Sequence, residues 1–286
     1  MFVASHRGIA RPYEEPEPYP AFGDRAAALN GFRLTYLDSD HEITLIQVLP
    51  GGESADLSPF ADLQPSRIPD GHLSVLLEDA EPSGEEFGYY AAHSLLTMPG
   101  ARRYQIRDVG CVNECVRRVP PSVLRDPFPG LAFGAAGGAL LALVGFRMFF
   151  TGNRNHNLDR VGVWFEEDNI HVAMRDADGG DTFAYLVDFV VIPTGFLNVF
   201  TGVEGGSGDR AFDTHQLPSI DRTDFVITGW EFNFEQGDHK ILDIGVIRGP
   251  ENLTGFYGDS GGGDRFDWRV QWAQVGPRVF APLSIV

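Results

Sequence analysis

Three histidines occupy equivalent places in the chain, each after a polar turn and before a run of aliphatic residues: His41, His156 and His239. Imidazole is a common metal ligand, so three copies that meet at one centre would suit a transition metal. The alternative is that each ring caps or packs at the start of a strand, because the residues before it are typical of turns. We favour the packing role for these histidines.

Two glycine-rich turns, 176–181 and 259–264, carry alternating carboxylates. Ca²⁺ takes six to eight oxygen ligands, which flexible acidic turns can supply. The candidate calcium ligands are Asp176, Asp178, Asp181, Asp259 and Asp264. Neither turn has the distant bidentate glutamate of an EF-hand, and Asp and Gly are also what an ordinary hairpin requires. We favour plain turns and expect no cofactor other than this candidate Ca²⁺.

The sequence contains none of the common catalytic motifs. GxSxG, HExxH, the P-loop and a GxGxxG after a strand are all absent. Pairs of carboxylates occur, but in so acidic a chain their closeness in sequence says little about a catalytic dyad. We therefore expect a non-enzymatic protein without catalytic residues, and keep a polysaccharide hydrolase as a distant alternative.

The composition of the chain limits the kinds of partner that we expect it to bind. The 286 residues include 40 acidic and 22 basic ones, a formal net charge of −18 that disfavours nucleic acid and anionic membranes. The first residues lack the apolar stretch of a signal peptide, and the longest uncharged run, 130–146, is too short to span a membrane and indicates a buried strand. We expect a soluble protein of a cytoplasmic assembly or of a virion or extracellular particle.

Cys111 and Cys115 lie four residues apart in an arginine-rich stretch. Two thiols without a nearby histidine make a weak metal site, and a disulfide between them would close a very small loop. They are either reduced thiols or a local clip, and no catalytic role is expected.

The histidines belong to a three-element motif that occurs three times. The first element is glycine, aromatic, three residues, aromatic; the second runs from the histidine through aliphatic residues to valine; the third is glycine, acid, any residue, Phe, any residue, Tyr or Trp. In order along the chain, the elements cover 31–36, 41–48 and 84–89, then 145–150, 156–163 and 180–185, then 229–234, 239–246 and 263–268. An ordered triple match predicts an array of one supersecondary unit.

Runs of β-branched and aromatic residues between turn signals predict an all-β protein of tandem antiparallel β-sandwich repeats. The segments before each first element, RAAALN, GGALLALV and DFVIT, are expected to add a strand to each unit. A short helix ending at Pro120-Pro121 and a flexible EGGSGDR turn are expected between the units. The predicted domains are a Pro-rich arm 1–24, repeat 1 at 25–100 with a surface insertion 50–71, a linker 101–128, repeat 2 at 129–195, a linker 196–219, repeat 3 at 220–278 and a tail 279–286.

The repeats resemble the H-type lectin domain. The third copy contributes VITGWEFNF, ILDIGV, ENLTGFYG and GDRFDWRVQWAQVG, and the second LVGFRMFF, NLDRVGV and GDTFAYLVDFVV. The resemblance implies a six-stranded antiparallel β-sandwich that assembles as trimers and binds N-acetylgalactosamine-like sugars between neighbouring subunits. Three copies in one chain would then form a pseudo-trimer.

The resemblance also assigns sugar-contacting residues in the second copy. They are Arg160, Thr182 and Tyr185, with Asp181 beside them. Gly179 and Gly180 stand where the family has a tryptophan and a polar ligand, so a sugar would lose its stacking platform.

We therefore expect a protein that acts in structural assembly or surface recognition, such as a component of a phage tail, a virion or a contractile particle. Its partners would be protein subunits, itself included. A carbohydrate-binding lectin or adhesin is the alternative, with glycans as partners. Specific binding is expected where the copies diverge, at the insertion, the linkers and the arm.

Overall fold

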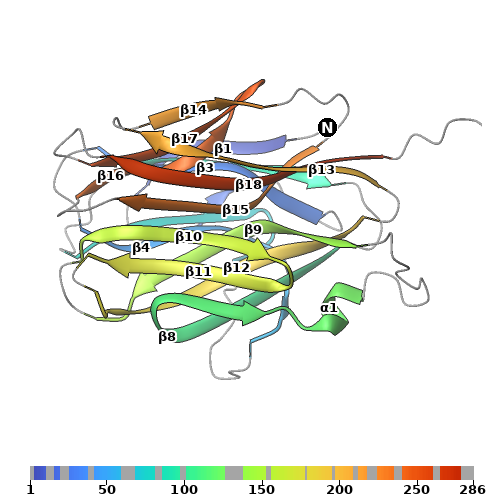
Figure 1. Ribbon diagram of the computed structural model, residues 1–286, viewed down its shortest axis with the longest axis horizontal. Helices are drawn as coiled ribbons and strands as arrows, with labels where there is room; N and C mark the ends of the chain where they lie inside the picture. Colours follow the sequence, from blue (N-terminus) through green and yellow to red (C-terminus); the bar gives the residue numbers. More distant parts are fainter. Residues whose placement is uncertain are drawn as a thin grey trace, which may run out of the picture.

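The computed structural model confirms the predicted all-β class, with antiparallel sheets throughout (Figure 1). It describes residues 3–10, 16–19, 26–37, 42–58, 68–80, 86–96, 101–125, 138–152, 156–177, 179–194, 197–208, 212–217, 224–234, 240–259 and 265–277. Within these ranges the single helix is α1 (Pro121–Arg125), and one short strand, β5 (Ala55–Asp56), pairs in parallel with its neighbour. No helix in the described residues is long and apolar enough to cross a membrane.

Each copy of the motif forms four strands. Copy 1 consists of β3 (Ala26–Tyr36), β4 (Ile43–Pro50), β6 (His72–Asp79) and β7 (Phe87–Leu96). Copy 2 consists of β9 (Ala139–Phe150), β10 (Leu158–Glu166), β11 (Asn169–Asp176) and β12 (Thr182–Pro193). Copy 3 consists of β15 (Asp224–Phe234), β16 (Ile241–Arg248), β17 (Asn252–Asp259) and β18 (Phe266–Pro277). In every copy the first strand pairs with the fourth and the second with the third.

An outer strand precedes each copy and joins its two halves. These outer strands are β1 (Val3–Ala10) with β2 (Glu17–Pro18), β8 (Arg102–Arg118), and β13 (Leu197–Gly208) with β14 (Phe212–Gln216). The first part of each pairs with the fourth strand of its copy, and the last part pairs with the third strand. The outer strand therefore turns the corner between the two layers of a sandwich.

Several expectations for the connecting segments need correction. The arm and both linkers contain these outer strands, the helix begins at Pro121 instead of ending there, and Glu204–Gly208 of the expected flexible turn lies in β13. The segments before the first elements are the beginnings of β3, β9 and β15, not extra strands. The outer strands mix exposed apolar residues with partly buried polar ones, so their sequences lack the pattern of a strand with one apolar and one polar face.

The copies are joined by strand pairing in a closed circuit. The second strand of each copy pairs with the first strand of the next: β4 with β9, β10 with β15, and β16 with β3. The register is the same at all three junctions, with Val48 opposite Phe146, Val163 opposite Trp230, and Val246 opposite Phe32. The three copies thus form a pseudo-trimer within one chain.

This circuit produces two continuous sheets. One has the order β1-β7-β3-β16-β17-β14, and the other β13-β18-β15-β10-β11-β8-β12-β9-β4-β6-β2. In Figure 1 the run β18, β15, β10, β11 and β8 descends the front of the molecule, so strands of copies 3 and 2 form one surface.

The pseudo-three-fold centre is apolar. The motif aromatics Phe32, Phe146 and Trp230 are at most 1% exposed, and each pair of their ring centroids lies 4.9 to 5.0 Å apart. Such tilted aromatic contacts add to the free energy gained by burial. The centre therefore holds one aromatic ring from each copy, and His156 lies elsewhere, beside Asp176.

A β-bulge precedes the motif glycine in every copy. The residue before that glycine, Asn30, Val144 or Thr228, is skipped in the pairing of the first strand with the fourth. The glycines leave room for a neighbouring chain, since a Cβ on Gly145 would lie 2.5 Å from the Val48 carbonyl oxygen. Past the bulges a second apolar cluster brings the three first strands together through Ala28, Ala142, Val144 and Val226. The bulge changes which side chains face inward, so the core continues along the strands.

Candidate functional site

The clearest cluster of chemically competent side chains lies at one end of copy 2. The Nδ1 atom of His156 is 3.0 Å from an Asp176 carboxylate oxygen and 3.2 Å from one of Asp181. His156 is fully buried, the Asp176 side chain is 2% exposed, and the Asp181 side chain is 29% exposed. One nitrogen and two carboxylates therefore meet at a point that solvent reaches only past Asp181.

Local structure brings these three residues together. Asp176 ends β11 opposite Leu158, two residues after His156, so strand pairing sets the first contact. Gly179 and Gly180 have φ of +70° and +96°, a conformation that favours glycine, and turn the chain so that Asp181 follows. The ring of His156 stacks on Phe150 with 4.0 Å between centroids. The packing role expected for the histidine is thus present together with the carboxylate contacts.

The other expected calcium ligands do not join this cluster in the described residues. Asp178 and Asp264 lie outside the described ranges, as do His41 and His239. Asp259 accepts a hydrogen bond from the backbone N–H of Lys240 in copy 3. Asp176 and Asp181 are the two expected ligands that the structure brings together.

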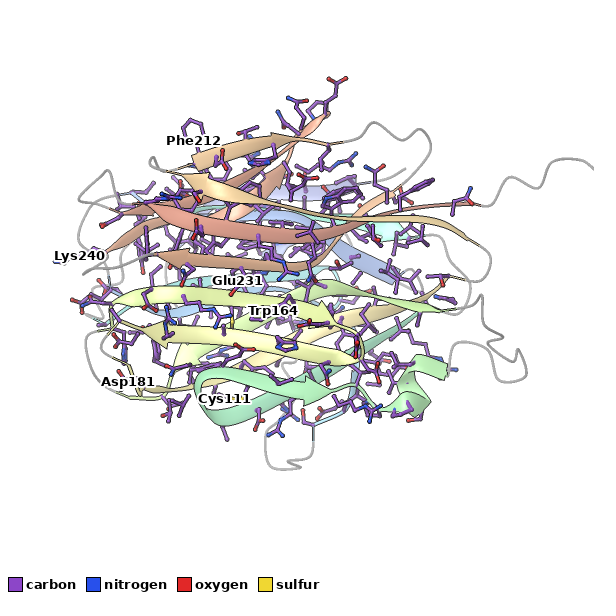
Figure 2. The ribbon with its side chains drawn as sticks, viewed as in Figure 1. Cys111, Trp164, Asp181, Phe212, Glu231 and Lys240 are labelled. Carbon is purple, nitrogen blue, oxygen red and sulfur yellow. A yellow bond between two sulfur atoms is a disulfide. The ribbon has the colours of Figure 1, made fainter. Side chains whose placement is uncertain are left out.

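The expected sugar-binding residues are dispersed. Thr182 hydrogen bonds Thr151. Tyr185 is 2% exposed, and burial together with the nearby Asp108 carboxylate raises the pKa of its phenol. Figure 2 places Asp181 at the end of the strands, away from Glu231, the partner of Arg160. Of the expected sugar contacts, Tyr185 is thus buried, and Arg160 pairs with Glu231.

Arg160 instead lies in an open depression between copies 2 and 3. The depression has a volume of about 410 Å³. It is lined by Arg160, Arg175, Glu231, Asn233, Asp267, Trp268 and Arg269. Most of these residues point outward from strands in which apolar and polar residues alternate. The period-two patterns WEFNF and FDWRVQ in the sequence therefore indicated their positions. The indole N–H of Trp268 donates to Asp213.

Ion pairs link neighbouring copies at two junctions, and the basic and acidic residues exchange strands between these junctions. At the junction of copies 2 and 3, Arg160 on the second strand donates to Glu231 on the first, at 2.7 Å. At the junction of copies 3 and 1, Asp243 on the second strand accepts from Arg33 on the first, at 2.9 Å. Burial raises the pKa of Asp243 although Arg33 opposes this shift. The corresponding position of copy 1 is Leu45, so the junctions are not interchangeable.

The cysteines form a disulfide, with 5.6 Å between the Cα atoms of Cys111 and Cys115. This clip spans the point where β8 changes its partner from β12 to β11. Gly110 and Asn113 beside it have positive φ, as a sharp change in strand direction requires. Of the two alternatives from the sequence, the structure has the local clip.

Comparison with known proteins identifies no relative in sequence. No family model and no curated protein matches the chain. Among solved structures, the major capsid protein P2 from Bacteriophage PM2 is similar at 8% identity and a TM-score of 0.18, over 65% of this chain and 96% of that one. A structure of Sulfolobus Turreted Icosahedral Virus is similar at 8% identity and a TM-score of 0.17, over 96% of this chain and 91% of that one. Likeness at this level carries no conclusion about fold or function.

Proposed function

We propose that the protein is a non-enzymatic β-sandwich subunit that acts in structural assembly or surface recognition, as components of a phage tail, virion or contractile particle do. The observation that carries this proposal is the position of the exposed large apolar side chains. In the described residues they are Val3 and Ile9 on β1, Val109, Val112 and Val116 on β8, Phe200 and Val203 on β13, Phe212 on β14, and Leu37. All but Leu37 lie on the outer strands.

Exposed apolar residues on related strands are typical of protein contact surfaces, because burying them against a partner releases water. Phe212 is 56% exposed and Ile9 60%. In the sheet order, β1 and β13 also end their sheets, so their outer backbone groups can pair with another chain. Figure 2 shows Phe212 and Cys111 at opposite ends of the molecule, so outer strands of different copies face different directions. A subunit with several such surfaces can bind several neighbours.

The role of the repeated motif in the core supports the same proposal. Its residues form strand junctions, bulges and the aromatic centre, whereas the outer strands differ between copies in length and sequence. A repeated core with divergent surfaces suits a scaffold whose partners are proteins.

Self-association tests this function. We expect light scattering after gel filtration to show oligomers of the 31.4 kDa chain that increase with concentration and with salt, since salt screens the charge of −18. The double variant Phe200→Ser/Phe212→Ser should shift the protein to monomer, whereas Thr201→Ser, next to Phe200 on β13, should not. A wild-type protein that stays monomeric at high concentration and at about 0.5 M salt, roughly three times physiological ionic strength, contradicts self-assembly.

A lectin is the second candidate, because the depression lies between two copies, where the H-type lectin resemblance expects a sugar. Arginine, carboxylate and amide groups there can hydrogen bond sugar hydroxyls. A glycan array should then give a saturable signal that Arg160→Ala and Arg269→Ala each abolish. Silence of the wild-type protein across the array eliminates this candidate.

A further inference from the structure

We propose that His156, Asp176 and Asp181 form a structural site for a divalent transition-metal ion of the zinc class at the end of copy 2. The inference is independent of the proposed assembly role. It starts from the donor atoms, which are one imidazole nitrogen and two carboxylate oxygens, all within 4.8 Å of one another.

The spacing of these atoms suits a small ion. Zinc binds histidine nitrogen and carboxylate oxygen at about 2.0 to 2.2 Å, so two ligands of a tetrahedral ion lie roughly 3.4 Å apart. The Nδ1 atom of His156 lies 3.0 and 3.2 Å from its two carboxylate partners. These two nitrogen–oxygen distances are within a few tenths of an ångström of the tetrahedral spacing, and the Asp181 side chain is partly exposed at the edge of the site.

Charge favours a cation at the same point. A single N–H on Nδ1 can point at one carboxylate only, while both Asp176 and Asp181 approach that nitrogen. The Asp176 side chain is 2% exposed, and a buried carboxylate is stabilised by opposite charge beside it. A divalent ion would neutralise both carboxylates at once, and a buried histidine held against Phe150 is already oriented to bind it.

The same residue types recur in the other copies. Each motif histidine stands two residues before a strand residue that pairs with an aspartate: Ile43 with Asp79, Leu158 with Asp176, and Ile241 with Asp259. The acid after the third-element glycine is Glu85, Asp181 and Asp264 in turn.

The backbone N–H that follows the histidine donates to that aspartate in copies 1 and 3, from Glu42 to Asp79 and from Lys240 to Asp259. The aspartate position is thus held at the strand end in the same way in copies 1 and 3, and the second acid recurs in the sequence of every copy. His41, His239, Glu85 and Asp264 lie outside the described residues, so the site is assigned to copy 2.

The ligand set selects zinc over calcium. Ca²⁺ prefers six to eight oxygens, whereas a nitrogen ligand with few carboxylates is typical of zinc and neighbouring transition metals. The ion would tie the turn after β11 to the turn before β10, which stabilises the end of the copy.

Zinc binding after treatment with a chelator tests the site. We expect Zn²⁺ to raise the melting temperature and Ca²⁺ to leave it unchanged. Asp181→Asn, which alters the exposed ligand and spares the core, should weaken the copy 2 site by at least ~10-fold in titration calorimetry. Asp168→Asn, in the other hairpin turn of copy 2, should bind as the wild type does.

Crystals soaked in Zn²⁺ locate the ion, and so distinguish binding in copy 2 from binding in copies 1 and 3. An anomalous peak about 2.1 Å from Nδ1 of His156 is expected in the wild type and not in Asp181→Asn. The proposal is overturned by the absence of that peak, by an unchanged affinity in Asp181→Asn, or by a response to Ca²⁺ and not to Zn²⁺.

Discussion

At the scale of single residues, the motif positions divide into two kinds. Glycines and aromatics permit the close approach of strands from different copies, as at Gly145 and Trp230. Histidine and acidic residues gather at the strand ends, as at His156. The first kind maintains the fold, and the second places one imidazole nitrogen close to two carboxylates in copy 2.

Gly145→Ala should destabilise the protein by about 1–3 kcal/mol, because the new Cβ would lie 2.5 Å from the backbone oxygen of Val48 and force the strands apart. Urea unfolding followed by circular dichroism measures the change. Gly152→Ala is the matched control, since a Cβ there meets nothing within 4 Å. Equal stabilities of the two variants would contradict the tight junction.

His93 makes stability depend on pH. It is fully buried, Tyr19 and the Val144 carbonyl lie within hydrogen-bond distance of its ring, and burial lowers its pKa from 6.5 to about 4. The unfolded chain therefore binds a proton that the folded one does not, and stability is lost as pH falls from about 6.5 to about 4. The raised pKa values of Asp188 and Asp243 act in the opposite direction.

We expect His93→Gln to lose less stability than the wild type between pH 7 and pH 4, by up to about 3 kcal/mol. Melting temperatures of both proteins across this pH range test the prediction. The contributions of Asp188 and Asp243 to the pH dependence cancel in the comparison, because both proteins contain them. Parallel curves for the two proteins would show that the pKa of His93 is the same in the folded and the unfolded chain.

At the scale of elements, the outer strands decide how each copy closes. β8 pairs with β12 through its first part and with β11 through its last part, and the disulfide spans the change. β1 with β2, and β13 with β14, make the same two pairings as separate strands. The clip thus belongs to β8, which is continuous across both pairings in the described residues.

Reduction of the disulfide should lower stability by about 2 kcal/mol, the amount expected for so short a closed loop. Hydrogen exchange should rise first in residues 113–118, whose pairing with β11 begins at the clip. The variant Cys111→Ser/Cys115→Ser should not respond to reductant. Unchanged exchange in this segment after reduction would show that the clip does not hold the bend.

At the scale of the whole molecule, no copy is complete alone. Every first strand has one neighbour from its own copy and one from another copy. The aromatic centre takes one ring from each copy. Sheets and core are therefore shared, in contrast to independent domains on a string.

Unfolding should accordingly be one cooperative transition, with circular dichroism and tryptophan fluorescence giving the same midpoint. The fragment 101–195, which contains copy 2 and its outer strand, should remain unfolded, because β9 and β10 lose their partners β4 and β15. A fragment with native strand content and a melting transition of its own would show that the copies are autonomous.

The sequence by itself determined the all-β class, the three copies and the positions of most of their strands. These follow from local patterns: alternation of apolar residues, turn glycines, and a motif whose spacing survives in each copy. The aromatics and glycines of the motif were identifiable because the same residue types recur at the same spacing in all three copies.

Only the tertiary structure decided the outer strands, the pairing between copies and the meeting of His156 with Asp176 and Asp181. The outer strands carry apolar residues on their exposed face and polar ones in partly buried positions, so they lack the alternation that reveals a strand. Pairing between copies depends on contacts between residues far apart in the chain, which no local pattern records. The carboxylates reach the histidine because strand register and two glycines bring distant turns together, and that geometry exists only in the folded chain.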